Sequence, residues 1–130
     1  VIPNLLVDAI CEALKKTSAS KICVCNVMGQ PGETEGYTAF QHVEAILNHG
    51  GCVEYAVLNT AAIPDEITEK YKEEGVGPVF LDEARFRECG IGLIKAPLLD
   101  KEHGLARHSP DRLADCLAKA ILAIENGIAF

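Results

Sequence analysis

The sequence predicts an α/β fold in which a Rossmann-like parallel sheet is covered by helices on both faces. Helical and strand-like patterns alternate from one end of the chain to the other, which favours strands joined by crossover helices. The apolar runs are short and continuous, as is typical of strands that are buried on both faces. Hydrophobic residues make up 48% of the 130 residues, so the chain can bury a sizeable core.

The expected elements follow from apolar periodicity and from turn residues at their boundaries. In chain order they are a helix over 4–17, a strand over 22–27, a helix from 38 to about 49, a strand over 53–58, a helix over 64–74, a strand over 78–81, a helical turn over 84–88, a strand over 91–96 and a helix that begins at 109–111.

Each longer helix has a recognisable start. Asn4 is the expected N-cap of the first helix. Thr38, with Gln41 three residues later, predicts a capping box for the second. Pro64 suits the first turn of the third helix, and Ser109 precedes a proline at the start of the last. Glycines follow the second, third and last of these helices and are expected to end them.

The strands of a parallel sheet direct the search for a site. Ligands of such sheets bind in the crevice beyond the carboxyl ends of the strands. Four loops are therefore the candidates, and they follow Val27, Leu58, Leu81 and Ala96.

The loop after the first strand is the most unusual stretch of the chain. Its glycines permit close backbone approach and positive φ, and the N–H groups of Ala39 and Phe40 are expected to be free at the start of the next helix. These features favour a phosphate or a base edge, although an ordinary connecting loop explains the same residues. Its spacing matches neither a P-loop nor the dinucleotide fingerprint. The candidate ligand-binding residues here are Asn26, Gln30, Gly32, Glu33, Thr34, Gly36, Tyr37 and Thr38.

Two further segments carry candidate residues. Arg107, just before the last helix, suits a phosphate or carboxylate, or it pairs with a nearby carboxylate such as Asp111. His108 is either a general acid or base or a partly buried loop residue. Tyr71 lies four residues after Ile67, so it is either a core residue with its hydroxyl at the rim or a ring that stacks on a base or sugar.

Metal binding and catalysis by carboxylates are not indicated. Glu33, Glu35, Asp82 and Asp100 lie in loops or at a strand end without a defined spacing. The four histidines have no ligand spacing with the cysteines, so no metal site is expected.

Composition limits the class of protein. The six cysteines form no C-x-x-C pair, which favours reduced structural thiols in a cytoplasmic protein. A net charge of −7 argues against broad contact with nucleic acid, and no apolar run is long enough for a membrane span. The abrupt start of the chain inside a helical pattern suggests a fragment or a processed piece.

Several uncommon motifs occur in the order and at the separations known from one family. They are Ile2-Pro3-Asn4-Leu5-Leu6-Val7, Val24-Cys25-Asn26-Val27-Met28 followed by the loop to Thr38, the segment from Tyr71 to Val79, Lys95-Ala96-Pro97-Leu98-Leu99, and Arg107-His108-Ser109-Pro110. On these motifs the chain resembles the CofD-like family, and within it the YvcK-type gluconeogenesis-factor branch.

The resemblance implies a Rossmann-like CofD fold of which residues 1–130 are the C-terminal part, with a glycine-rich N-terminal half outside this chain. The resembled branch is needed for cell shape and for peptidoglycan synthesis when bacteria grow on gluconeogenic carbon sources. It binds UDP-sugars such as UDP-N-acetylglucosamine, and no reaction is established for it. The positions tied to that binding correspond to Tyr71 and Arg107.

The resemblance also implies an alternative function, and the half-sheet implies a partner chain. A related branch transfers a phospholactyl group to a deazaflavin precursor, so a 2-phospho-L-lactate transferase that uses Mg²⁺ is the second reading. No cofactor is otherwise expected. Because a half-sheet has an open edge, a second copy of the chain or an N-terminal chain is the expected partner.

Overall fold

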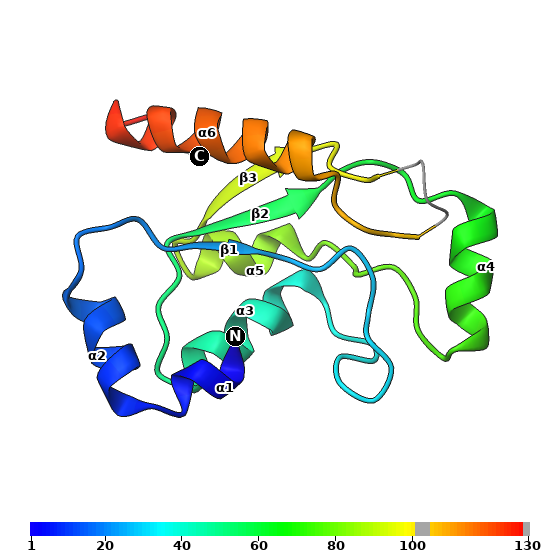
Figure 1. Cartoon of the computed structure of the whole chain (residues 1–130), viewed down its shortest axis with the longest axis horizontal. Helices are drawn as coiled ribbons and strands as arrows, with labels where there is room; N and C mark the ends of the chain where they lie inside the picture. The colour runs from blue at the N-terminus through cyan, green and yellow to red at the C-terminus, as the bar shows by residue number, and fades with distance from the viewer. Residues whose placement is uncertain (101–104, 129–130) are drawn as a thin grey trace.

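A computed structural model describes residues 1–100 and 105–128. It consists of a central sheet with helices on both faces (Figure 1). The elements are α1 (Ile2–Leu5), α2 (Asp8–Lys16), β1 (Ile22–Val24), α3 (Ala39–Asn48), β2 (Tyr55–Asn59), α4 (Asp65–Glu73), α5 (Glu83–Glu88), β3 (Gly92–Ala96) and α6 (Pro110–Glu125).

The sheet is parallel, with the order β1-β2-β3. Residues of the central strand β2 alternate between two buried layers, because successive side chains of a strand point to opposite faces. Ala56 and Leu58 pack in the layer of α3 and α5. Val57 packs in the layer of α6, where it meets Ile94 and Ala120. The predicted α/β fold with helices on both faces is confirmed.

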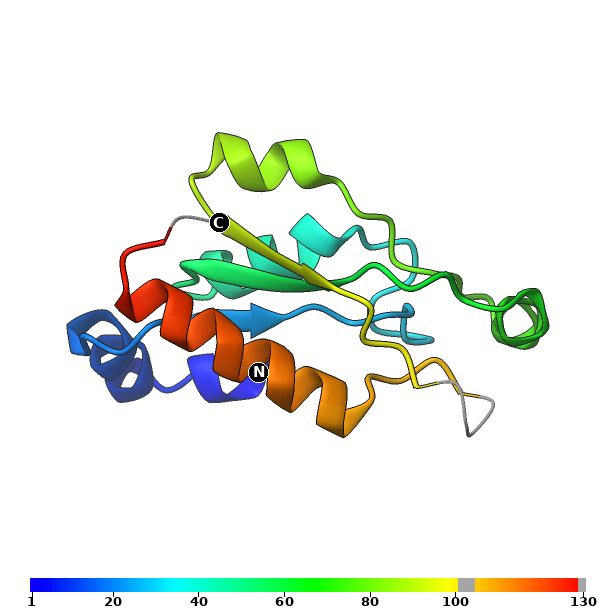
Figure 2. The same cartoon turned by 90° about the horizontal axis from the view of Figure 1, so that it is seen from above.

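The helices α3, α5 and α6 cover the two faces of the sheet, as the buried contacts of β2 require. Figure 1 shows α6 on one side of the strands and α3 with α5 on the other, and the view from above agrees (Figure 2). Phe40 of α3 and Phe86 of α5 meet edge to face, with ring centroids 5.3 Å apart. That geometry suits the quadrupoles of two aromatic rings, so the pair joins both helices under the sheet.

The prediction of one helix over 4–17 was wrong, because the chain breaks into α1 and α2. Asn4 lies inside α1, whose N-cap is Val1, and Val7 is extended with φ −102° and ψ 107°. The break allows both helices to bury a residue against the end of α3. The Cys11 thiol donates to the carbonyl of Leu5 at 3.2 Å, and both side chains are buried.

The strand predicted over 78–81 was also wrong. This segment forms only isolated bridges, between Pro78 and Met28 and between Phe80 and Thr38. Proline has no N–H for a strand ladder, and Phe80 is 69% exposed. The segment therefore pairs with the loop after β1, not with the sheet.

The other elements occur where the sequence predicts them, although the strands are shorter. β1 ends at Val24, but the N–H of Cys25 still donates to the carbonyl of Val57 at 3.1 Å. The capping box of Thr38 and Gln41 is present at the start of α3. The hydroxyl of Ser109 accepts from the backbone at the start of α6.

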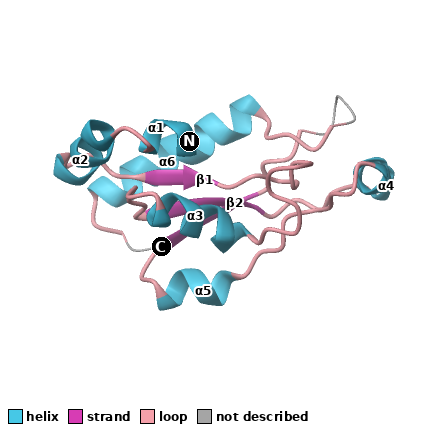
Figure 3. Cartoon of the chain, turned by 90° about the horizontal axis from the view of Figure 1, so that it is seen from below, coloured by secondary structure: helices cyan, strands magenta, loops and turns pink. Residues whose placement is uncertain are grey.

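The open edge of β1 lies on the side of the molecule that holds α1 and α6 (Figures 2 and 3). Figures 2 and 3 both place α1 and α6 along the β1 side of the molecule, with α5 on the opposite side.

All six cysteines are free thiols. No helix in residues 1–100 and 105–128 is both long and apolar enough to cross a membrane.

Candidate functional site

The carboxyl ends of the strands lead into loops that pack against α4 (Figure 1). A buried apolar cluster makes this contact, in which Ile67 of α4 meets residues from the loops after β1 and β3. Its loop members are Val27, Met28, Leu99 and Ala106. Because these loops and α4 share one small core, their polar side chains are held near one another at the edge where a parallel sheet binds ligands.

Backbone contacts hold the loops in place. The N–H of Gly29 donates to the carbonyl of Gly77 at 3.0 Å. A Cβ atom at Gly29 would lie 3.2 Å from the carbonyl oxygen of Thr34, so a side chain there would need the turn to shift by a few tenths of an ångström. On the other side, the N–H of Asp100 donates to the carbonyl of Arg107 at 2.8 Å. The walls of the crevice are thus built from hydrogen-bonded backbone.

One hollow of about 480 Å³ lies in this crevice, and we call it the Arg107 hollow. Its polar side chains are Asn26, Gln30, Tyr71, Arg107 and His108. Four of these were predicted for ligand binding from three separate parts of the sequence. Tertiary structure therefore brings the predicted arginine and tyrosine to the same hollow as the start of the loop after β1.

Arg107 carries an available charge. Its side chain is exposed, and among the described residues no carboxylate lies within ion-pairing distance of it. The alternative pairing with Asp111 is therefore not formed. A guanidinium without a carboxylate partner can bind a phosphate through two parallel hydrogen bonds. Tyr71 is half-buried and packs against the apolar cluster, so its ring has a fixed place beside this charge.

His108 is held neutral in the same hollow. Its Nε2 atom is buried and has no hydrogen-bond partner among the described residues, and burial lowers the pKa of the ring. Protonation at Nε2 would leave a buried N–H without an acceptor, which is costly. A neutral ring avoids placing an obligatory N–H at Nε2, so His108 contributes an uncharged polar side chain to the hollow.

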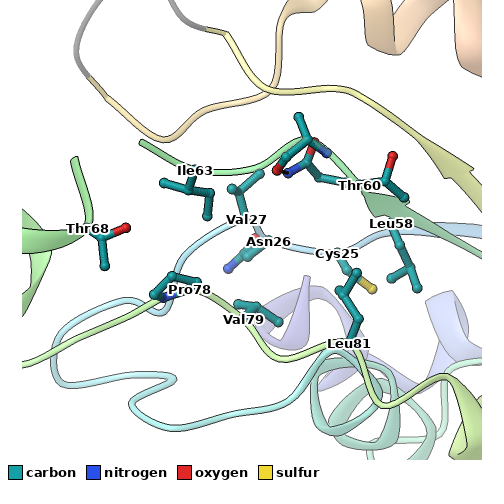
Figure 4. Close-up of a pocket in the computed structure, with 12 residues that line it drawn as sticks. Cys25, Asn26, Val27, Leu58, Thr60, Ile63, Thr68, Pro78, Val79 and Leu81 are labelled. Atoms are coloured by element: carbon teal, nitrogen blue, oxygen red, sulfur yellow. Dashed lines mark hydrogen bonds between the residues drawn. The ribbon is translucent and has the colours of Figure 1, made fainter. Parts of the chain in front are cut away.

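A second hollow of about 290 Å³ lies between the ends of β1 and β2 and α4, and we call it the Thr68 hollow (Figure 4). It shares Asn26 and Val27 with the Arg107 hollow. Within residues 1–100 and 105–128, none of the side chains that line it is charged. Its polar lining residues are Cys25, Asn26, Asn59, Thr60 and Thr68.

The rest of the loop after β1 is folded on itself. The N–H of Gln30 donates to the Thr34 hydroxyl at 2.9 Å, and the N–H of Gly32 donates to Glu35 Oε1 at 2.7 Å. Gly32 has φ of +73°, which a residue with a side chain rarely adopts. Within the described chain, neither hollow is lined by the remaining predicted residues, which are Gly32, Glu33, Thr34, Gly36, Tyr37 and Thr38. Their role in binding stays a prediction.

The expectation of free N–H groups at the start of α3 was wrong. The N–H of Ala39 donates to the carbonyl of Phe80 at 2.9 Å. The N–H of Phe40 donates to Asp82 Oδ1 at 2.9 Å, and the Thr38 hydroxyl donates to Asp82 Oδ2 at 2.6 Å. Phe80, in the segment that failed to form a strand, and Asp82 just after it thus occupy the donors that a phosphate would need.

The acidic and thiol groups near the site have structural partners. Asp82 caps α3, and Glu35 closes the loop after β1. The hydrogen bond with Cys23 and burial raise the pKa of Cys25, so this thiol stays protonated and is a poor nucleophile. No three His, Cys, Asp or Glu side chains in the described part of the chain gather as metal ligands do.

Comparison with known proteins decides the family. The family described as 2-phospho-L-lactate transferase CofD matches residues 1–99, which include both hollows except for Arg107 and its neighbours. The chain belongs to the CofD family. Within the CofD family it is similar to the gluconeogenesis factor of Bacillus subtilis, with 39% identity over 119 residues. It is also similar to the gluconeogenesis factor of Halalkalibacterium halodurans, with 38% identity over 119 residues.

These similarities cover most of this chain and a smaller part of each relative. The two alignments span 90% of this chain but 38% and 37% of the relatives. A crystal structure of a Bacillus halodurans protein matches 91% of this chain and 39% of its own, with a TM-score of 0.85 and 38% identity. The chain therefore spans well under half the length of the CofD-family relatives it matches.

Sequence reasoning missed the residues that the loop after β2 and α4 contribute to this CofD-family site. Thr60, Ile63 and Thr68 line the Thr68 hollow, yet none was named in advance. The rule that polar residues just beyond a strand end face the crevice identifies Thr60. Nothing local identifies Thr68, because only the tertiary packing of α4 brings it to the hollow.

Proposed function

We propose that this chain forms part of a regulatory protein that binds a UDP-sugar, with UDP-N-acetylglucosamine as the leading candidate. The observation that carries the proposal is the Arg107 hollow, where an arginine that pairs with no carboxylate of the described residues lies with Tyr71, His108 and two amide side chains. Arg107 binds the diphosphate, and Tyr71 packs on the uridine. The gluconeogenesis-factor names of the relatives support a role in gluconeogenic growth.

The proposed regulation is mass action. A ligand that binds one conformation of a protein better than another shifts the population toward that conformation. A cytoplasmic protein of this kind would report the supply of a cell-wall precursor, and through it support cell shape and peptidoglycan synthesis on gluconeogenic carbon sources. The net charge of −7 does not oppose this, because Arg107 supplies a local positive charge.

Replacement of Arg107 tests the proposal. Arg107→Ala should weaken UDP-N-acetylglucosamine binding by about 1–3 kcal/mol, the range for loss of a charged hydrogen-bond partner. Isothermal titration calorimetry on the intact protein measures this change. Arg87→Ala is the matched control, because Arg87 lies on α5 and pairs with Glu83, away from both hollows. Equal affinities of wild type and Arg107→Ala would contradict the proposal.

The family description favours a second candidate, a 2-phospho-L-lactate transferase that acts on a deazaflavin precursor. That reaction is expected to need Mg²⁺, which proteins usually hold through one or two carboxylates together with waters and substrate phosphates. Neither hollow is lined by a carboxylate of the described residues, so they favour the nucleotide-sugar proposal over this one. Incubation of the intact protein with donor and acceptor, followed by mass spectrometry of the product, distinguishes the two functions.

A further inference from the structure

The Thr68 hollow differs in chemistry from the Arg107 hollow beside it. Arg107 places a positive charge in the Arg107 hollow, whereas no charged side chain of the described residues lines the Thr68 hollow. A phosphate in the Thr68 hollow would lose water without gaining a counter-charge, and burial of an unpaired charge is costly. The Thr68 hollow therefore suits an uncharged group.

Polar groups are nevertheless available in the Thr68 hollow. Asn26 and Thr60 are exposed, and their side chains form no hydrogen bond with the described residues. The Thr68 hydroxyl donates to the carbonyl of Pro64 at 3.3 Å, so its oxygen can still accept a hydrogen bond. In Figure 4 the hydroxyl of Thr68 is directed from α4 toward the hollow.

Apolar side chains form the rest of the wall, and one polar residue keeps that wall in place. Val27 and Ile63 lie between the polar groups (Figure 4). Asn59 Oδ1 accepts from the N–H of Ala61 at 3.1 Å and from the N–H of Leu98 at 2.9 Å. These bonds tie the exit of β2 to the exit of β3. A preformed wall lowers the entropy cost of binding.

An uncharged pyranose ring has the chemistry that this hollow recognises. Its hydroxyl groups both donate and accept hydrogen bonds, and its C–H faces pack on apolar side chains. The two hollows share Asn26 and Val27, so one ligand with an anionic part and a neutral part can occupy both. Asn26, at the junction, can reach either part.

We propose that the Thr68 hollow is the subsite for the sugar of the nucleotide sugar and that Ala61, Thr68 and Asn26 help to set sugar specificity. This inference rests on the proposed function, in which Arg107 binds the diphosphate. It goes further because it assigns Ala61 and Thr68, which line the Thr68 hollow and not the Arg107 hollow, to the sugar, and Asn26 to the junction between the sugar and UDP.

The test compares UDP with UDP-N-acetylglucosamine on the intact protein by calorimetry. Ala61→Phe fills the Thr68 hollow and should weaken UDP-N-acetylglucosamine binding by more than about tenfold, while UDP binding stays within about twofold. Thr68→Val removes one hydroxyl at nearly constant volume and should weaken only the UDP-sugar, by about two- to tenfold. Ala62→Phe is the matched control, because Ala62 is the exposed neighbour and lines neither hollow.

The outcomes separate this inference from the proposed function. Loss of UDP affinity equal to the loss of UDP-sugar affinity in Ala61→Phe would overturn the sugar subsite, and so would an unchanged affinity for both. If Arg107→Ala weakens the binding of both UDP and UDP-N-acetylglucosamine, the proposed function stands whether or not the sugar subsite is overturned. Absence of wild-type binding to both nucleotides would overturn the two proposals together. Thermal melting of each variant excludes unfolding as the cause, and Thr68→Val provides the result if Ala61→Phe does not fold.

Discussion

His108 is the residue whose protonation the structure constrains most clearly. Its Nε2 atom is enclosed without a partner in the described part of the chain, whereas Arg107, the next residue toward the N-terminus, is exposed. Adjacent residues thus bring a cation and an uncharged imidazole to one hollow. A cation suits a phosphate, and a neutral imidazole can both donate and accept a hydrogen bond.

The lowered pKa of His108 predicts a pH dependence of stability. Burial favours the neutral ring, so the folded pKa lies below the ordinary value of 6.5. As the pH falls, the ring takes up a proton in the unfolded chain before it does so in the folded chain. The unfolded state then binds more protons, so the free energy of unfolding decreases as the pH falls. We expect the wild type to lose more stability than His108→Phe between about pH 7.5 and about pH 5.5.

Thermal melting at both pH values measures this difference. His49→Phe is the control, because His49 is exposed and its Nδ1 already lies 2.7 Å from the carbonyl of Ala45. The same pH dependence in the wild type and in His108→Phe would show that His108 is not the group responsible.

At the scale of elements, residues 80–82 occupy hydrogen-bond donors at the start of α3 that could otherwise bind an anion. A helix N-terminus with a glycine-rich loop before it is a common anion site. Here Asp82 and the carbonyl of Phe80 take the donors of Ala39 and Phe40. The positive end of the helix dipole is compensated by a carboxylate of the same chain, so the proposed anion site is at Arg107 and not at the start of α3.

The carboxylate of Asp82 should contribute measurably to stability. Asp82→Ala removes the acceptor of both the Thr38 hydroxyl and the Phe40 N–H, and we expect unfolding to become easier by about 1–3 kcal/mol. Chemical denaturation of the intact protein gives this value. Glu73→Ala, an exposed change on α4, is the control and should stay within about 0.5 kcal/mol. A loss for Asp82→Ala no larger than that of the control would contradict the capping role.

At the scale of the whole molecule, the sheet is open on the β1 side. The strands β1 and β3 each pair only with β2 in the described sheet. Apolar side chains remain exposed on or next to the helices beside β1. They include Leu6 at 71% exposure, between α1 and α2, and Leu122 of α6 at 60%. An open edge next to exposed apolar residues is a place for another chain to pair.

We therefore expect the 130-residue chain, when produced alone, to associate with a second copy or with an added N-terminal chain. Light scattering should give a mass above that of the 14.0 kDa monomer. Leu6→Glu and Leu122→Glu should lower that mass, because a charge opposes burial of the surface. Lys15→Glu on the exposed side of α2 is the matched control. A clean monomer for the wild type would contradict this prediction.

The family and most elements could be predicted from local patterns, whereas parts of the site could not. The capping box of Thr38 and the N-cap of Ser109 occur as expected, since caps depend on residues within one turn. The strand predicted over 78–81 failed because its pairing partner is a loop. Arg107 and Tyr71 were placed in one site through resemblance, and the structure brings them to the same hollow.

Periodicity, capping residues and glycine positions act over a few residues, and they were sufficient to specify a parallel α/β fold and the edge where its loops meet. The occupation of the α3 donors by Asp82, the break between α1 and α2, and the arrival of Thr68 beside Asn26 depend on contacts between distant segments. Such contacts are chosen by packing in the folded molecule, where each buried donor must find an acceptor and each apolar face a neighbour. For that reason the sequence predicted the edge of the sheet for a candidate site, and the three-dimensional structure decided which side chains line its hollows.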